Sequence, residues 1–160
     1  MKGNEITIYT DGSCHAQKRI GAWAAIVIIN IEKIVLKGVE INTTHNRMEL
    51  MAVIKAIEYV NNMIGRDVVI QLFTDSQYVM KLPVRSGQLH ADNFITKKGE
   101  ELKNADLLKS LISLFANHTV QLNKVKAHQK RDDTINLNRE ADMVSRNEVR
   151  ILARKAIHVF

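Results

Sequence analysis

The sequence predicts an α/β fold in which a five-stranded mixed sheet, with strand order 3-2-1-4-5, is flanked by helices. Two observations support this prediction. Three runs rich in β-branched and aromatic residues come first, and later runs of this kind alternate with segments of helical periodicity, as in layered α/β domains. The 160 residues contain one proline and no linker-like segment, so we expect a single domain over residues 1–160.

The first three elements are predicted strands. The first covers about residues 5–10 and ends at Asp11 and Gly12. The second and third, over 22–29 and 33–41, are separated by only three residues, so we expect them to pair as an antiparallel hairpin.

Helical and strand patterns alternate in the middle of the chain. A helix is predicted over about 46–62, because several N-cap residues precede apolar residues at helical spacing. A strand over 68–74 follows, and then a short helix over 77–81 that stops before Pro83. The polar segment 84–104 receives no assignment.

The C-terminal part of the chain repeats the alternation. An amphipathic helix over 106–115 is followed by a fifth strand over 119–125. A charged loop then leads to a last helix over about 138–157.

Strand directions bring four acidic residues to one edge of this sheet. A right-handed crossover places the fourth strand parallel to the first, so strand ends and helix starts meet at the same edge. Asp11 follows the first strand and Asp75 follows the fourth. Glu49 lies in the first turn of its helix, and Asp142 lies near the start of the last helix.

Each acid alone has a structural explanation, but the group does not. Asp11 could belong to a turn, Asp75 could cap a helix, and Glu49 and Asp142 could favour a helix dipole. Four carboxylates at one place repel each other, and burying them unpaired would cost several kcal/mol. Hard divalent cations such as Mg²⁺ resolve the repulsion, which indicates metal-dependent phosphodiester hydrolysis.

Composition limits the other functions. The formal net charge of +6 favours a polyanionic partner, and nucleic acid before membrane. The single cysteine excludes an internal disulfide, and no Cys/His pattern resembles a zinc site. The start of the chain has no apolar signal segment, and the apolar run 23–31 is too short to span a bilayer. We therefore expect a cytoplasmic protein.

The chain resembles a known family, the type 1 ribonucleases H of bacteria. The similarity extends over essentially the whole chain and rests on five segments in the family's order: YTDGSC at 9–14, TTHNRMELMA at 43–52, TDSQYV at 74–79, VKAH at 125–128 and NREAD at 138–142.

This resemblance implies cleavage of the RNA strand of RNA–DNA hybrids, with 5′-phosphate and 3′-hydroxyl ends. It implies two Mg²⁺ ions, with Mn²⁺ as a substitute. Asp11 would bridge both ions, Asp142 would hold the ion that activates water, and Glu49 and Asp75 would hold the ion at the leaving oxygen. His128 would assist proton transfer or product departure.

The resemblance also implies a set of substrate contacts. Side chains that match the family's minor-groove readers would distinguish RNA by its 2′-hydroxyl, and Thr44 would hold a phosphate of the DNA strand. The full set is Ser13, Cys14, Gln17, Thr44, His45, Asn46, Gln77 and Asn138. We expect the partner to be a hybrid duplex, with no membrane and no obligate protein partner, and the protein to be a monomer.

Several segments depart from the family pattern. Residues 15–20 replace a turn rich in glycine and proline, and His45 stands where asparagine is usual. The basic segment 81–104 has Phe94 as its only aromatic residue, where well-known members carry tryptophans. The interval from His128 to Asp142 is also longer than in the family.

Two other classes of protein fit the sequence less well. A non-catalytic nucleic-acid-binding module would not place four acids against phosphates. DNA resolvases, integrases and transposases share a similar sheet, but the segment Arg47-Met48-Glu49 at the start of the first helix fits them poorly.

Overall fold

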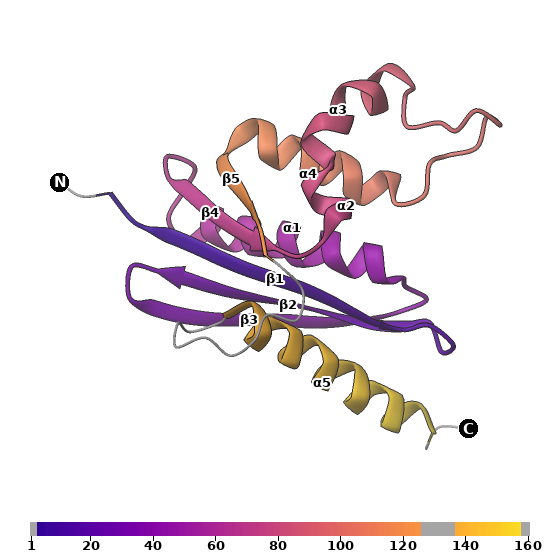
Figure 1. Cartoon of the computed structure of the whole chain (residues 1–160), viewed down its shortest axis with the longest axis horizontal. Helices are drawn as coiled ribbons and strands as arrows, with labels where there is room; N and C mark the ends of the chain where they lie inside the picture. Colours follow the sequence, from indigo (N-terminus) through magenta and orange to yellow (C-terminus); the bar gives the residue numbers. More distant parts are fainter. Residues whose placement is uncertain (1–2, 126–136, 158–160) are drawn as a thin grey trace.

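Within residues 3–125 and 137–157, which the computed structural model describes, five strands form one sheet in the order β3-β2-β1-β4-β5 (Figure 1). This confirms the predicted order. β1 pairs antiparallel with β2 and parallel with β4, β2 pairs antiparallel with β3, and β4 pairs parallel with β5. The elements are β1 (Ile6–His15), β2 (Ile20–Ile29), β3 (Glu32–Ile41), α1 (His45–Met63), β4 (Val69–Thr74), α2 (Gln77–Met80), α3 (Leu82–Ala91), α4 (Ala105–Asn117), β5 (Thr119–Lys124) and α5 (Leu137–Ile157).

Helices cover both faces of the sheet. On β2, Ala25 and Val27 belong to the large core cluster with α1, whereas Ile26 packs with Leu137 and Ala141 of α5. Successive strand residues point to opposite faces, so α1 and α5 lie on opposite sides of the sheet (Figure 1). This arrangement lets both helices reach the end of β1. None of the helices in the described part of the chain is both long and apolar enough to cross a membrane.

β1 is longer than predicted, and Asp11 lies within it rather than after it. The antiparallel ladder pairs Asp11 with Ala24 and continues to His15. The parallel ladder with β4 ends earlier, at the pair Tyr9 and Phe73. The long apolar partner strand β2 extends β1 through small residues that have little strand preference of their own. Asp11 therefore projects beyond the end of β4 while its backbone is still held in the sheet.

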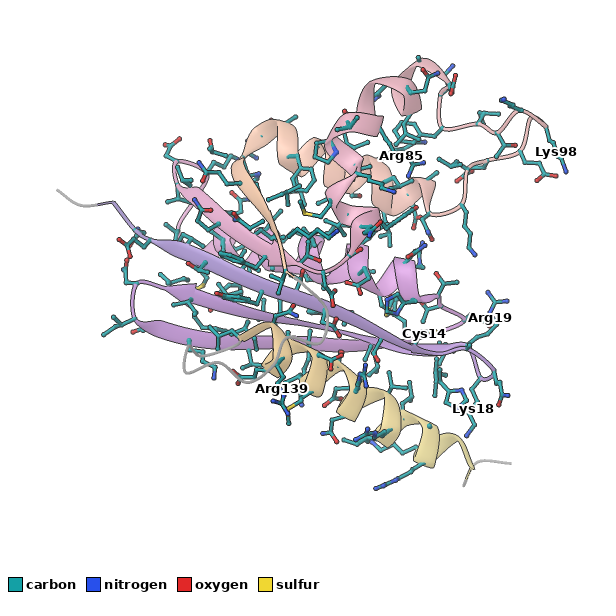
Figure 2. The ribbon with its side chains drawn as sticks, viewed as in Figure 1. Cys14, Lys18, Arg19, Arg85, Lys98 and Arg139 are labelled. Atoms are coloured by element: carbon teal, nitrogen blue, oxygen red, sulfur yellow. The ribbon has the colours of Figure 1, made fainter. Side chains whose placement is uncertain are left out.

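The segment left unassigned contains a helix and a protruding loop. As predicted, α2 ends before Pro83. Pro83 then lies in the first turn of a further helix, α3, where its missing N–H is tolerated, and α3 buries Leu82 and Leu89. Beyond α3, Thr96 N–H donates to Glu100 O at 2.7 Å, which closes a turn with exposed lysines. Figure 2 shows Lys98 at the tip of this loop, far from α5.

Candidate active site

Three of the four predicted acids meet at one edge of the sheet. One carboxylate oxygen from each of Asp11, Glu49 and Asp75 lies within 4.8 Å of the others. They come from β1, from α1 and from the residue that follows β4. Oxygen ligands of this kind suit hard divalent cations such as Mg²⁺. The predicted convergence of these three side chains is thus present in the structure.

A glycine allows α1 to come this close to β1. A Cβ atom on Gly12 would lie 2.5 Å from the backbone nitrogen of Glu49 and 2.7 Å from the carbonyl carbon of Met48. Both are backbone atoms of α1, so a side chain at this position would push the helix away. The absence of a side chain at Gly12 therefore sets the distance between two of the acidic residues.

The local roles of the acids differ from the sequence-based prediction. The first turn of α1 contains no acidic residue, because the helix begins at His45 and Glu49 lies in its second turn. Asp75 does not cap α2, because Ser76 is the N-cap and accepts a hydrogen bond from Val79 N–H at 3.2 Å. The helix-dipole and capping explanations for Glu49 and Asp75 therefore do not apply.

The electrostatics of the cluster favour a bound cation. Asp11 is 4% exposed and Glu49 is 2% exposed. Burial, and next the charge of Glu49, raise the pKa of Asp11 to about 8, against a hydrogen bond from Ser145 that lowers it. Burial likewise raises the pKa of Glu49, and Glu49 Oε2 has no hydrogen-bond partner among the described residues. Buried carboxylates whose pKa values are raised in this way favour a nearby cation, and the donor set fits Mg²⁺.

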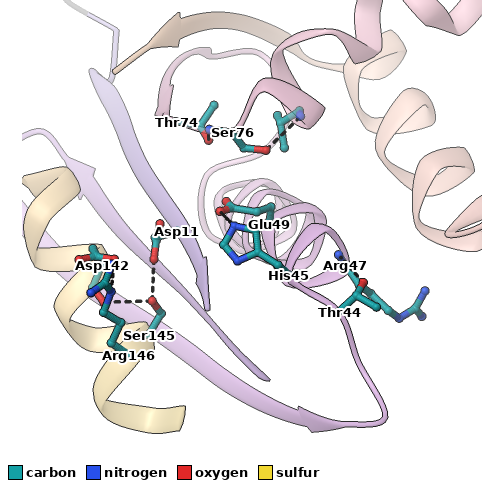
Figure 3. Close-up of polar contacts among 11 residues, drawn as sticks. Asp11, Thr44, His45, Arg47, Glu49, Thr74, Ser76, Asp142, Ser145 and Arg146 are labelled. Carbon is teal, nitrogen blue, oxygen red and sulfur yellow. Dashed lines mark hydrogen bonds and ion pairs between the residues drawn. The ribbon is translucent and has the colours of Figure 1, made fainter. Parts of the chain in front are cut away.

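Asp142 stands next to this cluster rather than within it. Its Oδ1 accepts a hydrogen bond from Arg146 Nε at 2.9 Å, one turn later on α5 (Figure 3). Its negative charge still contributes to the raised pKa of Asp11, so it faces the same site. The structure therefore places Asp142 beside the three converging acids with an arginine as its present partner.

His45, which is predicted as a substrate contact, lies against an acid of the site. Its Nε2 is 3.1 Å from Glu49 Oε1 (Figure 3). The hydrogen bond to Glu49 is the main cause that raises the pKa of His45, against burial, which lowers it. The i, i+4 spacing of the two residues on a helix could have revealed this pair in the sequence.

The other predicted substrate contacts come from several elements. Thr44 is the N-cap of α1, and its side chain accepts a hydrogen bond from Arg47 N–H at 3.3 Å. Asn46 and Gln77 are exposed in the first turns of α1 and α2. Asn138 is buried at the start of α5.

Three predicted contacts lie on or near the hairpin of β1 and β2. Ser13 and Cys14 are half-buried in β1, and the Cys14 thiol donates to Thr43 O at 3.7 Å. Gln17 is exposed in the turn after β1, and the next residue, Lys18, is labelled in Figure 2. The predicted catalytic residue His128 lies outside the described residues.

Comparison with known proteins gives one family. The model of the RNase H family matches residues 3–150. A ribonuclease H of Caldicellulosiruptor saccharolyticus is 36% identical over 148 residues, which cover 91% of this chain and 97% of the relative. A ribonuclease HI of Caulobacter vibrioides is 39% identical over 147 residues, which cover 91% of this chain and 93% of the relative.

Solved structures have the same fold. LC9-RNase H1, described as a type 1 RNase H with the type 2 active-site motif, superposes with a TM-score of 0.77 at 20% identity, covering 93% of this chain and 74% of that one. A foamy viral protease–reverse transcriptase in complex with dsDNA superposes with a TM-score of 0.68 at 20% identity, covering 91% of this chain and 96% of that one.

Proposed function

Because the chain belongs to the RNase H family, we propose that it cleaves the RNA strand of RNA–DNA hybrids endonucleolytically at a site that holds two divalent metal ions. The match to the family model and to relatives named ribonuclease H supports the reaction, and it makes the protein a nuclease of the hydrolase class. We further propose that it acts as a cytoplasmic monomer. The observation that carries the proposal is the convergence of Asp11, Glu49 and Asp75 within 4.8 Å.

The acids would hold the metal ions. Asp11, Glu49, Asp75 and Asp142 supply only carboxylate oxygens, the donors that Mg²⁺ prefers, and Mn²⁺ would substitute for it. When bound, two such ions stabilise the attacking and leaving oxygens of a phosphoryl displacement. The raised pKa of Asp11 and the unpartnered Glu49 Oε2 support a site built for positive charge.

Each acid would act from its own place in the fold. Asp11 lies close to Glu49 and also contacts Ser145 of α5, so it would contribute to holding both ions. Glu49 and Asp75 would hold the ion on the side of the leaving 3′ oxygen, and Asp142 the ion on the side of the attacking water. The products would then carry 5′-phosphate and 3′-hydroxyl ends.

Polar groups around the acids would bind the hybrid. Asn46 and Gln77 are exposed at the starts of α1 and α2, and each is close in sequence to an acid of the site. There they would contact 2′-hydroxyl groups of the RNA strand. Thr44, at the N-terminus of α1, would contact a phosphate of the DNA strand.

The remaining predicted contacts complete this proposal. Ser13, Cys14, Gln17, His45 and Asn138 would contribute to substrate binding, and His128 to proton transfer or product departure. The net charge of +6 supports association with a polyanion around the acidic centre.

A cleavage assay tests the proposed function. We expect purified protein with Mg²⁺ to cut the RNA of an end-labelled hybrid and to leave duplex DNA intact, with activity lost in chelator and restored by Mg²⁺. Asp75→Asn should remove at least about 99% of the turnover while hybrid binding survives. The matched control is Asp67→Asn, because Asp67 is exposed just before β4, at the opposite end of that strand.

Two results would contradict the proposal. One is equal cutting of double-stranded DNA, and the other is unchanged turnover in the Asp75 variant. Analysis of the product ends would test the predicted 5′-phosphate separately.

A further inference from the structure

A buried serine from a distant part of the sequence contacts one acid of the site. The Ser145 hydroxyl of α5 lies 2.7 Å from Asp11 Oδ2, although the residues are 134 positions apart (Figure 3). Ser145 is fully buried and Asp11 is 4% exposed, so water does not compete for this hydrogen bond. The distance is typical of a well-formed hydroxyl hydrogen bond and lies within the range found for a carboxylate acceptor.

The hydroxyl has two acceptors within reach, and the nearer one is the carboxylate. Ser145 Oγ also lies 3.1 Å from the backbone oxygen of Asp142, one turn earlier on α5. Helical serines often return their proton to such a carbonyl, but a serine has only one proton to donate. The shorter distance favours donation to Asp11, and the negative charge of the ionised carboxylate adds to this preference.

This bond determines how the carboxylate of Asp11 is turned. Glu49 and Asp75 repel that carboxylate, and a hydrogen bond on one oxygen opposes its rotation away from them. We propose that Ser145 is a positioning residue, which holds the Asp11 carboxylate in the orientation from which Asp11, Glu49 and Asp75 bind a divalent cation. This inference rests on the proposed function, in which these acids hold the metal ions.

The same bond fixes α5 relative to β1. Asp142 precedes Ser145 by three residues, so both lie on one side of the helix. A hydrogen bond from Ser145 to β1 therefore also sets the position of Asp142 relative to Asp11. The Ser145 hydroxyl thus aligns two acids that come from different elements, Asp11 of β1 and Asp142 of α5.

Thr10 offers a matched control for the loss of a buried hydroxyl. Its side chain is as buried as that of Ser145 and precedes Asp11 directly, and its Oγ1 has no hydrogen-bond partner in the part of the chain that the structure describes. Thr10→Val removes a hydroxyl and keeps the shape, so it reproduces the burial without the contact to Asp11.

The test is Mg²⁺ binding to the full chain without nucleic acid, measured by isothermal titration calorimetry. We expect Ser145→Ala to bind Mg²⁺ about 10-fold more weakly than the wild type, as is usual when a partner of a metal ligand is removed. Thr10→Val should bind like the wild type, and Ser145→Thr, which keeps the hydroxyl, should recover affinity. Circular dichroism on the same samples verifies that each variant is folded.

The outcomes separate this inference from the proposed function. Equal Mg²⁺ affinity of Ser145→Ala and wild type, or an equal loss in Thr10→Val, would overturn the positioning role. If the wild type neither binds Mg²⁺ nor cleaves a hybrid, the proposed function fails and the positioning role falls with it.

Discussion

His45 Nε2 and Glu49 Oε1 lie 3.1 Å apart across one turn of α1, so a side chain at the edge of the site forms an ion pair with a buried carboxylate when it is protonated. The nearby acids Asp11 and Asp75 add to the effect of Glu49 in raising the pKa of His45. The imidazole therefore stays positively charged to a higher pH than the ordinary histidine value of about 6.5. In that state it holds one of the two carboxylate oxygens of Glu49, and its positive charge disfavours a second cation at the same group.

The first prediction concerns this competition. Mg²⁺ affinity of the wild type should rise as pH increases through the raised pKa of His45, because the ion pair with Glu49 is present at low pH and lost above that pKa. His45→Ala should bind Mg²⁺ about fivefold more tightly at pH 6, as expected when a competing ion pair of about 1 kcal/mol is removed. Calorimetry between pH 6 and 8 measures both. Ionisation of Asp11 changes the affinity of both proteins over this range, so a ratio of the two affinities that does not vary with pH would disprove the competition.

The second prediction concerns the stability of the metal-free protein. A carboxyl group whose pKa is raised to about 8 in the folded state disfavours folding increasingly as pH rises from about 4 to 8, because the unfolded chain ionises Asp11 first. Asp11→Asn should therefore increase the free energy of unfolding at pH 7 by about 2 kcal/mol, although we also expect it to abolish turnover. Urea unfolding in chelator measures the gain. A gain that is equally large at pH 4 would show a different cause.

The third prediction tests the close approach of β1 and α1. Gly12→Ala places a Cβ against the backbone of α1, so we expect a loss of about 2 to 3 kcal/mol in the free energy of unfolding and a strong loss of activity. Gly87→Ala is the control, because Gly87 lies in α3 with open space around it, and alanine should stabilise a helix by about 0.5 to 1 kcal/mol. A Gly12 variant as stable and active as the wild type would contradict the packing described for this site.

The fourth prediction concerns an ion pair that supports the start of α1. Arg47 donates two hydrogen bonds to Asp106 of α4, at 2.9 and 2.6 Å. The hydrogen bonds from Arg47 are the main cause that lowers the pKa of Asp106 to about 2, so the stabilisation is complete above the usual value near 3.8 and is lost as pH falls through about 2.

We expect Arg47→Ala to lower the free energy of unfolding by about 1 kcal/mol at pH 7. A double-mutant cycle with Asp106→Ala isolates the pair, and a coupling energy of zero would show that it does not support the helix.

The fifth prediction concerns the protruding loop. Lys97 and Lys98 are exposed near its tip, and α3 and this loop carry no tryptophan for stacking. If the loop contacts the hybrid, it does so through charge. Replacing both lysines by alanine should weaken hybrid binding and reduce the slope of log Kd against log salt by about 1 to 2. Lys55→Ala, on the exposed side of α1, is the control, and an unchanged salt dependence would exclude the loop from the interface.

The sequence predicts that the acids converge, but it does not predict the secondary structure around each of them equally well. Alternating strand and helix patterns were sufficient to place Asp75 directly after β4 and to bring it to the edge near Asp11. The extension of β1 through Asp11 was not predictable, because it depends on pairing with β2 rather than on the residues of β1 themselves. The helix α3 was missed because only Leu82 and Leu89 mark its buried side.

Contacts between segments that are distant in the sequence could not be predicted from it. Nothing near Ser145 indicates that its hydroxyl reaches Asp11, since the pair exists only once α5 packs on the sheet. The same holds for the close approach of Gly12 to Met48.

The oxygens of the acidic cluster belong to three segments that only the folded chain holds together. An unfolded chain has no such chelate, so cation binding and folding are thermodynamically linked. Each tenfold rise in free Mg²⁺ above the dissociation constant would then add about 1.4 kcal/mol per ion to the fold. In a cell that is short of magnesium, this enzyme would be inactive and its less stable fold would be degraded more easily.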